Sequence, residues 1–219
     1  MAIVTAQVEI RGRKALIWNC FGPDALPLEK KARSGVAGND PDEWRKTVLV
    51  TPDNQLYIYP SYIFGSLRNG AARIKRGRGT LQSTVTATLE VQEGRVLINR
   101  WLPKEGFEEL KQAETAPVYL DIRTVRNPAT KARNVRYRVA ASPGWESTFT
   151  ISWDNTVVGE NEMKAVVRDA GQFAGLGDGR NIGFRRFEVC SFRTLENNIA
   201  KKPAAKRAVA RTSKKGMES

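Results

Sequence analysis

Two segments with helical periodicity, each lying between β-rich segments, constrain the fold of this chain most strongly. Within 62–76 the apolar residues recur at spacings of three and four, at Ile63, Leu67, Ala71 and Ile74. Within 161–173 the residues at such spacings are Met163, Val166, Val167, Ala170 and Phe173. Apolar residues at this period share one face of a helix, so the sequence predicts two amphipathic helices. Ser61, directly after Pro60, is the predicted N-cap of the first helix.

The segments around these helices carry the β-branched and alternating apolar patterns of strands. The predicted strands are 2–18, 44–50, 55–59, 80–91, 95–99, 118–125, 134–140, 149–153 and 182–192. The first hairpin joins 44–50 to 55–59 and the second joins 118–125 to 134–140, while 102–117 is predicted to hold a short helix and a connector.

The order of the main elements is therefore strand, helix, strand, repeated once, with hairpins inserted. This order predicts an α+β fold with a modified ferredoxin-like or RRM-like core, in which two helices cover one face of an antiparallel sheet. The other face of such a sheet, or the loops at its edge, can bind single-stranded RNA. We expect one domain over 1–198, with a long loop at 22–42 and a hairpin insertion at 118–140, followed by a disordered basic tail at 199–219.

The charge balance predicts a polyanionic partner. The chain has 36 basic and 23 acidic residues, a net charge of +13. The segment 201–219 holds seven basic residues and one acidic residue, which leaves 29 basic and 22 acidic residues in the rest of the chain. The body is basic as well as the tail, and such a field attracts nucleic acid, anionic lipid or an acidic protein.

Several function classes are excluded or disfavoured. No run of about 18 apolar residues is present, and the first residues lack the features of a secretory signal, so we expect a cytoplasmic protein without a membrane partner. The two cysteines are too few for a disulfide framework or a cysteine-based zinc site. The absence of histidine excludes Ser–His and Cys–His nucleophiles. No cofactor is predicted.

Two segments carry residues suited to phosphate binding. The first, 59–73, begins a helix with Pro60 and Ser61 and contains Arg68 and Arg73. A helix start favours anions, although Gly65 and Gly70 could equally serve close packing against the sheet. The second, 174–189, places four glycines and three arginines between the second helix and the last strand. Glycine lets a backbone approach a ligand closely, and arginine can bind phosphate with two parallel hydrogen bonds.

Together, these two segments resemble motifs of the RAMP superfamily, in particular the backbone subunits that coat the guide RNA in CRISPR effector complexes. The matching residues of the first motif are Pro60, Ser66, Leu67, Arg68, Gly70 and Arg73. Those of the second are Gly175, Gly177, Gly179, Arg180, Gly183, Phe184, Arg186 and Phe187. Phe64–Gly65 stands in for the family's usual small-residue turn, and Arg185 lies where a glycine is common.

The resemblance implies that copies of the chain stack along a guide RNA, beside other effector-complex subunits, while a target nucleic acid pairs with the guide. It also implies that the hairpin at 118–140 is a thumb that slots between nucleotides; the plainer interpretation is a solvated basic hairpin. The predicted RNA-binding residues are Ser66, Arg68, Arg73, Arg76, Arg126, Lys131, Arg133, Arg136, Tyr137, Gly177, Gly179, Arg180, Arg185 and Arg186.

We expect a protein without catalytic activity. Some backbone subunits of the superfamily cut bound RNA with an aspartate on an early loop, so Asp40 and Asp42 are the candidates for a metal-dependent nuclease. Ordinary turn chemistry also explains both residues. A third alternative is a structural or interaction protein of a phage or mobile element, basic for other reasons.

Overall fold

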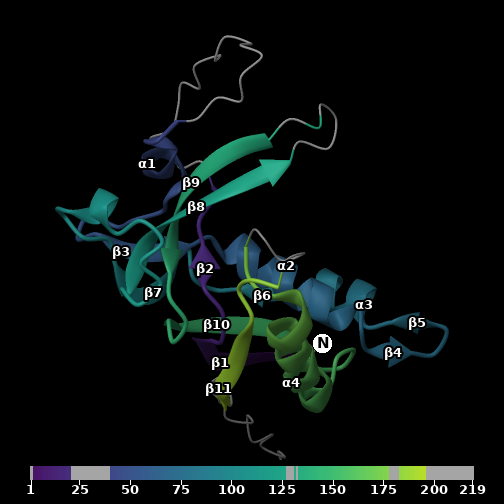
Figure 1. Ribbon diagram of the computed structural model, residues 1–219. Coiled ribbons are helices and arrows are strands. Elements are labelled where there is room, and N and C mark those ends of the chain that lie inside the picture. Colours follow the sequence, from purple (N-terminus) through teal and green to yellow (C-terminus); the bar gives the residue numbers. More distant parts are fainter. Residues whose placement is uncertain (1, 21–39, 127–130, 132, 178–182, 196–219) are drawn as a thin grey trace, which may run out of the picture.

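The computed structural model describes residues 2–20, 40–126, 131, 133–177 and 183–195 of the chain (Figure 1). Its main sheet is antiparallel, with the strand order β11–β1–β10–β7–β3 and with β6 also paired to β10. The strands are β1 (Ile3–Gly12), β3 (Gln55–Ile58), β6 (Glu90–Val91), β7 (Val96–Trp101), β10 (Glu146–Asp154) and β11 (Phe187–Leu195).

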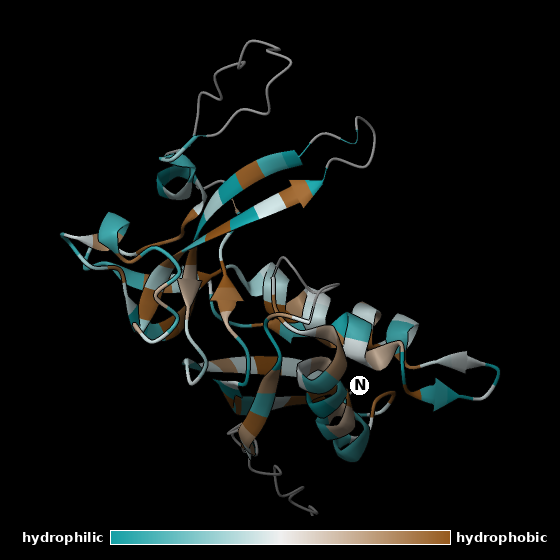
Figure 2. Ribbon diagram, in the orientation of Figure 1, coloured by the Kyte–Doolittle hydropathy of each residue, from teal (hydrophilic) through white to brown (hydrophobic). Residues whose placement is uncertain are grey.

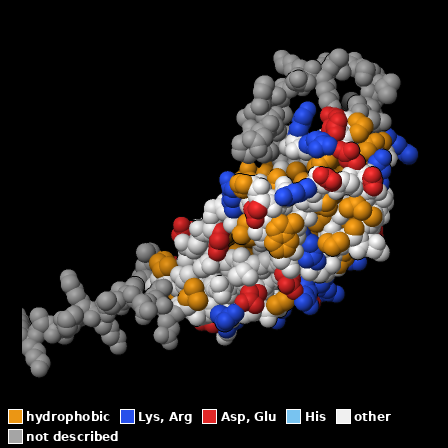
Figure 3. All heavy atoms as spheres, turned by 90° about the vertical axis from the view of Figure 1, so that its left-hand side faces the viewer, with side chains coloured by type: hydrophobic (Ala, Val, Ile, Leu, Met, Phe, Trp, Pro, Cys, Tyr) orange, Lys and Arg blue, Asp and Glu red, His pale blue; other side chains and the backbone are white. Residues whose placement is uncertain are grey.

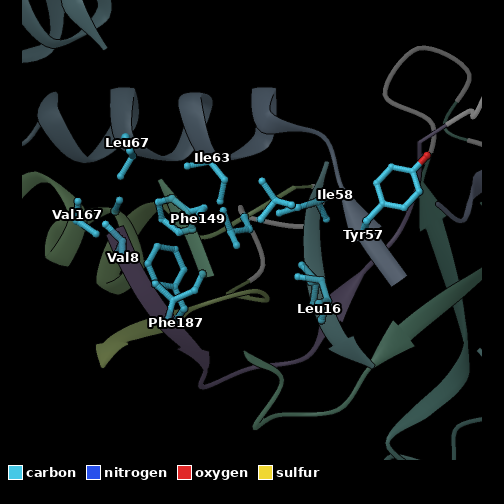
Figure 4. Close-up of a cluster of buried hydrophobic side chains, with 14 of the residues drawn as sticks. Val8, Leu16, Tyr57, Ile58, Ile63, Leu67, Phe149, Val167 and Phe187 are labelled. Carbon is cyan, nitrogen blue, oxygen red and sulfur yellow. The ribbon is translucent and has the colours of Figure 1, made fainter. Parts of the chain in front are cut away.

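Helices cover one face of this sheet. They are α2 (Pro60–Ala71), α3 (Gln82–Thr88) and α4 (Glu160–Asp169), which continues into the π-helical turn η3 (Ala170–Ala174). Leu67 of α2 and Val167 of α4 point toward Val8, Phe149 and Phe187 of the sheet (Figure 4). The α+β fold with a ferredoxin-like core is thus confirmed, because alternating strand residues and one stripe of each helix bury a common apolar layer.

The two principal helices cross closely at Gly70. A Cβ atom at this position would lie 2.5 Å from the carbonyl oxygen of Val166 and 2.7 Å from the nitrogen of Ala170. Only glycine therefore permits this approach between α2 and the end of α4. The crossing holds the C-terminal end of α2 against η3, which leads into the glycine-rich loop.

A second sheet projects from the core. It has the order β2–β9–β8, with β2 (Leu16–Ile17), β8 (Val118–Arg126) and β9 (Arg133–Ala141). The β8–β9 hairpin, which confirms the prediction for 118–140, extends beyond the body of the molecule next to α1 (Glu43–Thr47) (Figure 1). Hydrophilic and hydrophobic residues alternate along both of its strands (Figure 2). The remaining elements are β4 (Lys75–Arg76), β5 (Gly79–Thr80) and the short helix η2 (Phe107–Glu109).

Two predicted strands are wrong. Most of 44–50 is not extended: α1 forms at its start, where Trp44 packs on Phe107 with ring centroids 4.7 Å apart, and only its end runs beside β3. Most of 80–91 forms α3. Leu81, Val85 and Leu89 are buried at a spacing of four residues, so the helical period of the buried face overrides the β-propensity of the threonines.

The boundaries of other elements also differ. The first helix begins at Pro60 with Tyr59 as its N-cap, so the prediction that Ser61 is the cap is wrong, and the helix ends at Ala71 rather than at 76. The predicted first strand is divided into β1 and β2. Between them, the backbone amides of Arg13 and Lys14 donate to the carbonyl oxygen of Arg186 (2.8 and 3.2 Å), which turns the chain.

Some predictions lie outside the described residues. These are the long loop over 22–39 and the basic tail at 199–219. Within the described part of the chain, no helix is long and apolar enough to cross a membrane.

Candidate nucleic-acid interface

The C-terminal end of α2 presents exposed arginines beside the glycine-rich loop. Arg68 and Arg73 are both exposed, whereas Ser66 is buried. The guanidinium of Arg73 lies 4.6 Å from the ring centroid of Phe173, in η3. This cation–π contact orients Arg73 over the start of the loop while its hydrogen-bond donors stay accessible. The burial of Ser66 differs from its prediction as an RNA-binding residue.

The described part of the glycine-rich loop is a close-packed turn. Gly175 and Gly177 have φ angles of 71° and 65°, in the left-handed region that favours glycine. The amide of Leu176 donates to the carbonyl oxygen of Arg185 (3.1 Å), and the amide of Arg185 donates to that of Ala15 (3.1 Å). These hydrogen bonds tie the two sides of the loop to each other and to the segment before β2.

Arg185 belongs to the interior of this loop. Its side chain is fully buried and its Nη1 donates to the carbonyl oxygen of Leu176 (3.4 Å). The prediction that Arg185 binds RNA is therefore corrected: the left-handed turn at this residue (φ 66°) directs the guanidinium inward, where it holds the loop together. The next residue, Arg186, is only half-buried.

Arg186 and Arg73 are neighbouring cations, and we call them the arginine pair. Burial lowers the pKa of Arg186, and the positive charge of Arg73 lowers it further. The Nη1 atom of Arg186 is buried and has no hydrogen-bond partner among the described residues. No carboxylate in the described ranges lies within ion-pair distance of either guanidinium. Two neighbouring cations without a described carboxylate favour the binding of an anion at the exposed guanidinium of Arg73.

The β8–β9 hairpin divides into an exposed tip and a neutralised root. The tip carries exposed Arg126, Lys131 and Arg133. At the root, buried Asp121 contacts Arg123 at 2.5 Å and Arg138 at 3.5 Å.

The root also contacts α1. Glu43 forms an ion pair with Arg136 and accepts a hydrogen bond from the backbone amide of Tyr137 (3.3 Å). Tyr137 is half-buried and packs against the core. The side of the molecule that contains α1 shows acidic and basic side chains next to one another (Figure 3). Arg136 and Tyr137 thus have structural partners at the root, while Arg126, Lys131 and Arg133 project at the tip.

Among the remaining predicted residues, Arg76, Asp40 and Asp42 contact other described parts of the molecule. Arg76 is exposed in β4, where its Nη1 donates to the carbonyl oxygen of Val157 (2.6 Å). Gly179 and Arg180 lie outside the described residues. Asp42 pairs with Arg45 (3.2 Å) and its amide donates to a carboxylate oxygen of Asp40 (3.2 Å). Among the residues that the structure describes, no three His, Cys, Asp or Glu side chains form a group that could hold a metal.

The open face of the main sheet differs from the α2 side. Arg11 forms an ion pair with Glu146 (2.7 Å), and Arg193 forms one with Glu9 (2.5 Å). Glu146 also accepts a hydrogen bond from Asn99 (3.2 Å). Because its described ion pairs already neutralise these arginines, this face is less suited to phosphate than the loops at the edge of the sheet.

Two residues of the interface were missed by sequence reasoning. Phe173 was assigned to the apolar face of the second helix, yet it is 39% exposed and supports Arg73. The sign of this exposure in the sequence was the position of Phe173 at the end of the apolar stripe of the second helix. Glu43 stood out only as a neighbour of the acidic residues Asp40 and Asp42, and its role at the hairpin root was missed because its partners lie more than 90 residues away in the chain.

Comparisons with known proteins concern the fold of the chain. No protein-family model matches the sequence, and no curated protein matches it. Among solved structures, the chain is similar to one chain in the cryo-EM structure of the Type III-B Cmr-beta bound to cognate target RNA, with a TM-score of 0.49 and 16% sequence identity. The match covers 88% of this chain and 61% of that chain, so this chain spans less than two thirds of the other's length.

Proposed function

We propose that this protein is a non-catalytic backbone subunit of a CRISPR RNA-guided complex, which binds guide-RNA phosphates and oligomerises along the RNA. The arginine pair carries this proposal. An RNA phosphate at the exposed guanidinium of Arg73 offsets the repulsion between the charges of Arg73 and Arg186.

The rest of the interface fits a polyanion longer than one phosphate. Arg68 lies in the last turn of α2 and Arg73 follows just after the helix, and the hairpin tip adds Arg126, Lys131 and Arg133. Phosphate contacts of this kind position a protein on RNA without reading its sequence. This agrees with a role in which base pairing between guide and target supplies the specificity. The RAMP-like motifs around Pro60–Arg73 and Gly175–Phe187 support the same assignment.

The test uses the full-length protein and two matched charge reversals. Arg186→Glu changes the arginine pair, and Lys104→Glu makes the same charge change on the exposed connector after β7. We expect the wild type and Lys104→Glu to retain RNA through a high-salt wash, measured as the ratio of absorbance at 260 and 280 nm. For Arg186→Glu we expect loss of this RNA and at least ~10-fold weaker binding of a single-stranded RNA probe.

Two outcomes contradict the proposal in different ways. Equal RNA retention by Arg186→Glu and the wild type would remove the arginine pair as the binding site. A wild-type protein that carries no RNA and binds no single-stranded probe would favour the alternative, a structural or interaction protein of a phage or mobile element. Circular dichroism of each variant separates lost binding from lost folding.

A further inference from the structure

A groove beside the edge strand β11 has features that RNA binding does not use. It lies between α4 and β11, which are neighbours at one end of the main sheet (Figure 1). The groove has a volume of about 480 Å³. Its lining residues are Arg13, Lys164, Arg168, Gln172, Phe187, Glu188, Val189 and Phe192. We call it the α4–β11 groove.

The strand side of the groove is a long sheet edge. β11 spans Phe187–Leu195 and pairs with β1 on one side, while no strand of the described residues pairs with its other side. A free edge presents a row of backbone donors and acceptors that can take up another strand. η3 covers only the beginning of this edge, where it packs against Phe187.

The helix side of the groove is a basic stripe. Lys164, Arg168 and Gln172 are exposed and follow one another at a spacing of four residues, so they line the same flank of α4 and η3. Lys164 forms an ion pair with Glu160 (2.7 Å), whereas Arg168 and Arg13 have no carboxylate within ion-pair distance among the residues described. Glu188, the cross-strand neighbour of Arg11, is the one acidic residue among those that line the groove.

The aromatic rings of the groove argue against nucleic acid as the occupant. Phe187 is buried. Phe192 contacts Trp153 edge-on, with centroids 6.1 Å apart, and the ammonium of Lys164 lies 5.6 Å from its centroid. Bases of single strands stack on aromatic faces, whereas here Phe187 is buried and the ammonium of Lys164 lies over Phe192.

Two occupants from this chain itself are also disfavoured by charge. The segment 201–219 has seven basic residues and one acidic residue, the same sign as Arg168 and Arg13. A second copy pairing edge to edge through a two-fold axis would bring two basic stripes together. The free edge and the unpaired cations instead complement an acidic strand.

We propose that the α4–β11 groove binds an extended acidic segment of a partner protein, which adds to β11 as a further strand. Side chains alternate along a strand, so every second residue of the segment faces α4. Glutamates at those positions cover Val189 and Phe192 with their methylene groups and bring carboxylates to Arg168 and Arg13. Backbone hydrogen bonds to the edge give affinity, and the charges select an acidic sequence.

Binding is tested with three fluorescein-labelled seven-residue peptides and the full-length protein. The first has glutamate at alternate positions with threonine or valine between them, the second has lysine in place of glutamate, and the third is the first with alternate backbone amides methylated. We expect fluorescence polarisation to show binding of the first peptide only, because lysine repels the stripe and methylation removes the donors needed for strand addition. For Arg168→Glu we expect at least ~10-fold weaker binding of the first peptide, and for Lys104→Glu an unchanged affinity.

Each other result overturns the proposal. Equal binding of the glutamate and lysine peptides would show that the stripe does not select charge. Undiminished binding of the methylated peptide would exclude strand addition. A single-stranded RNA heptamer that binds to the wild type and loses affinity in Arg168→Glu, with no peptide bound, would assign the groove to nucleic acid. RNA retention governed by Arg186 is measured separately, so this proposal and the proposed function can fail independently.

Discussion

The arginine pair and the hairpin root both contain arginines, but among the described residues only the root has carboxylates next to them. At the root, buried Asp121 contacts both Arg123 and Arg138, and Glu43 contacts Arg136. At the pair, burial and the charge of Arg73 lower the pKa of Arg186, and no carboxylate of the described residues lies within ion-pair distance of either guanidinium. At the root, ion pairs hold the hairpin to the body, whereas the charges of the arginine pair remain available to a ligand. A run of arginines therefore indicates a binding surface only after the acids brought in by the fold are known.

The largest expected effect is a loss of stability when an ion pair of the hairpin root is broken. Asp121→Asn keeps the shape of the side chain but leaves the buried guanidinium of Arg138 without its carboxylate. Breaking a buried ion pair by removing one partner costs about 3–5 kcal/mol, so we expect a loss of this size in the free energy of unfolding, measured in urea. Asp42→Asn, which removes an exposed ion pair with Arg45, should cost less than about 1 kcal/mol. Similar losses in both variants would contradict the contrast between a structural root and ordinary surface pairs.

The next expected effect is on RNA affinity, which should fall when the arginine pair is changed but not when the hairpin root is changed. Arg73→Gln removes one charge of the arginine pair, and Arg136→Gln removes one that Glu43 already neutralises. We expect Arg73→Gln to weaken binding of a single-stranded RNA about 10-fold and to reduce the slope of log K against log salt by about 1, as for the loss of one phosphate contact. Arg136→Gln should change the affinity by less than about 2-fold. A larger effect from Arg136→Gln would move the RNA contact to the hairpin root.

The smallest expected effect is on stability, which should rise in Arg186→Met and fall in Arg138→Met. Methionine retains much of the length of arginine and removes its charge. Arg186→Met relieves the repulsion from Arg73 and removes the unsatisfied buried donor, so we expect a gain of about 0.5–1 kcal/mol in stability together with loss of RNA binding. Arg138→Met should instead destabilise the protein, because Asp121 loses one of its two cations. Thermal and urea unfolding of the two variants provide the measurement, and destabilisation by both would show that the arginine pair is also structural.

The sequence predicted the elements whose patterns are local. The stripes of 62–76 and 161–173 gave two helices, and the alternating arms at 118–125 and 134–140 gave the hairpin, since burial on one face leaves a period in the sequence. It failed at α1 and α3. There, β-branched and aromatic residues form helices because the buried positions, such as Leu81 and Val85, repeat at helical spacing.

The sequence by itself determined the fold class, the basic character of the body and the glycine–arginine composition of the loop. Only the tertiary structure decided which arginines are available to a ligand. It turned Arg185 inward while Arg186 remained half-buried beside Arg73, and it brought Glu43 to Arg136 across 93 residues of chain. The physical reason is that a charge is neutralised by whatever lies within a few ångströms in space, and for most of these pairs the partner is distant in the sequence.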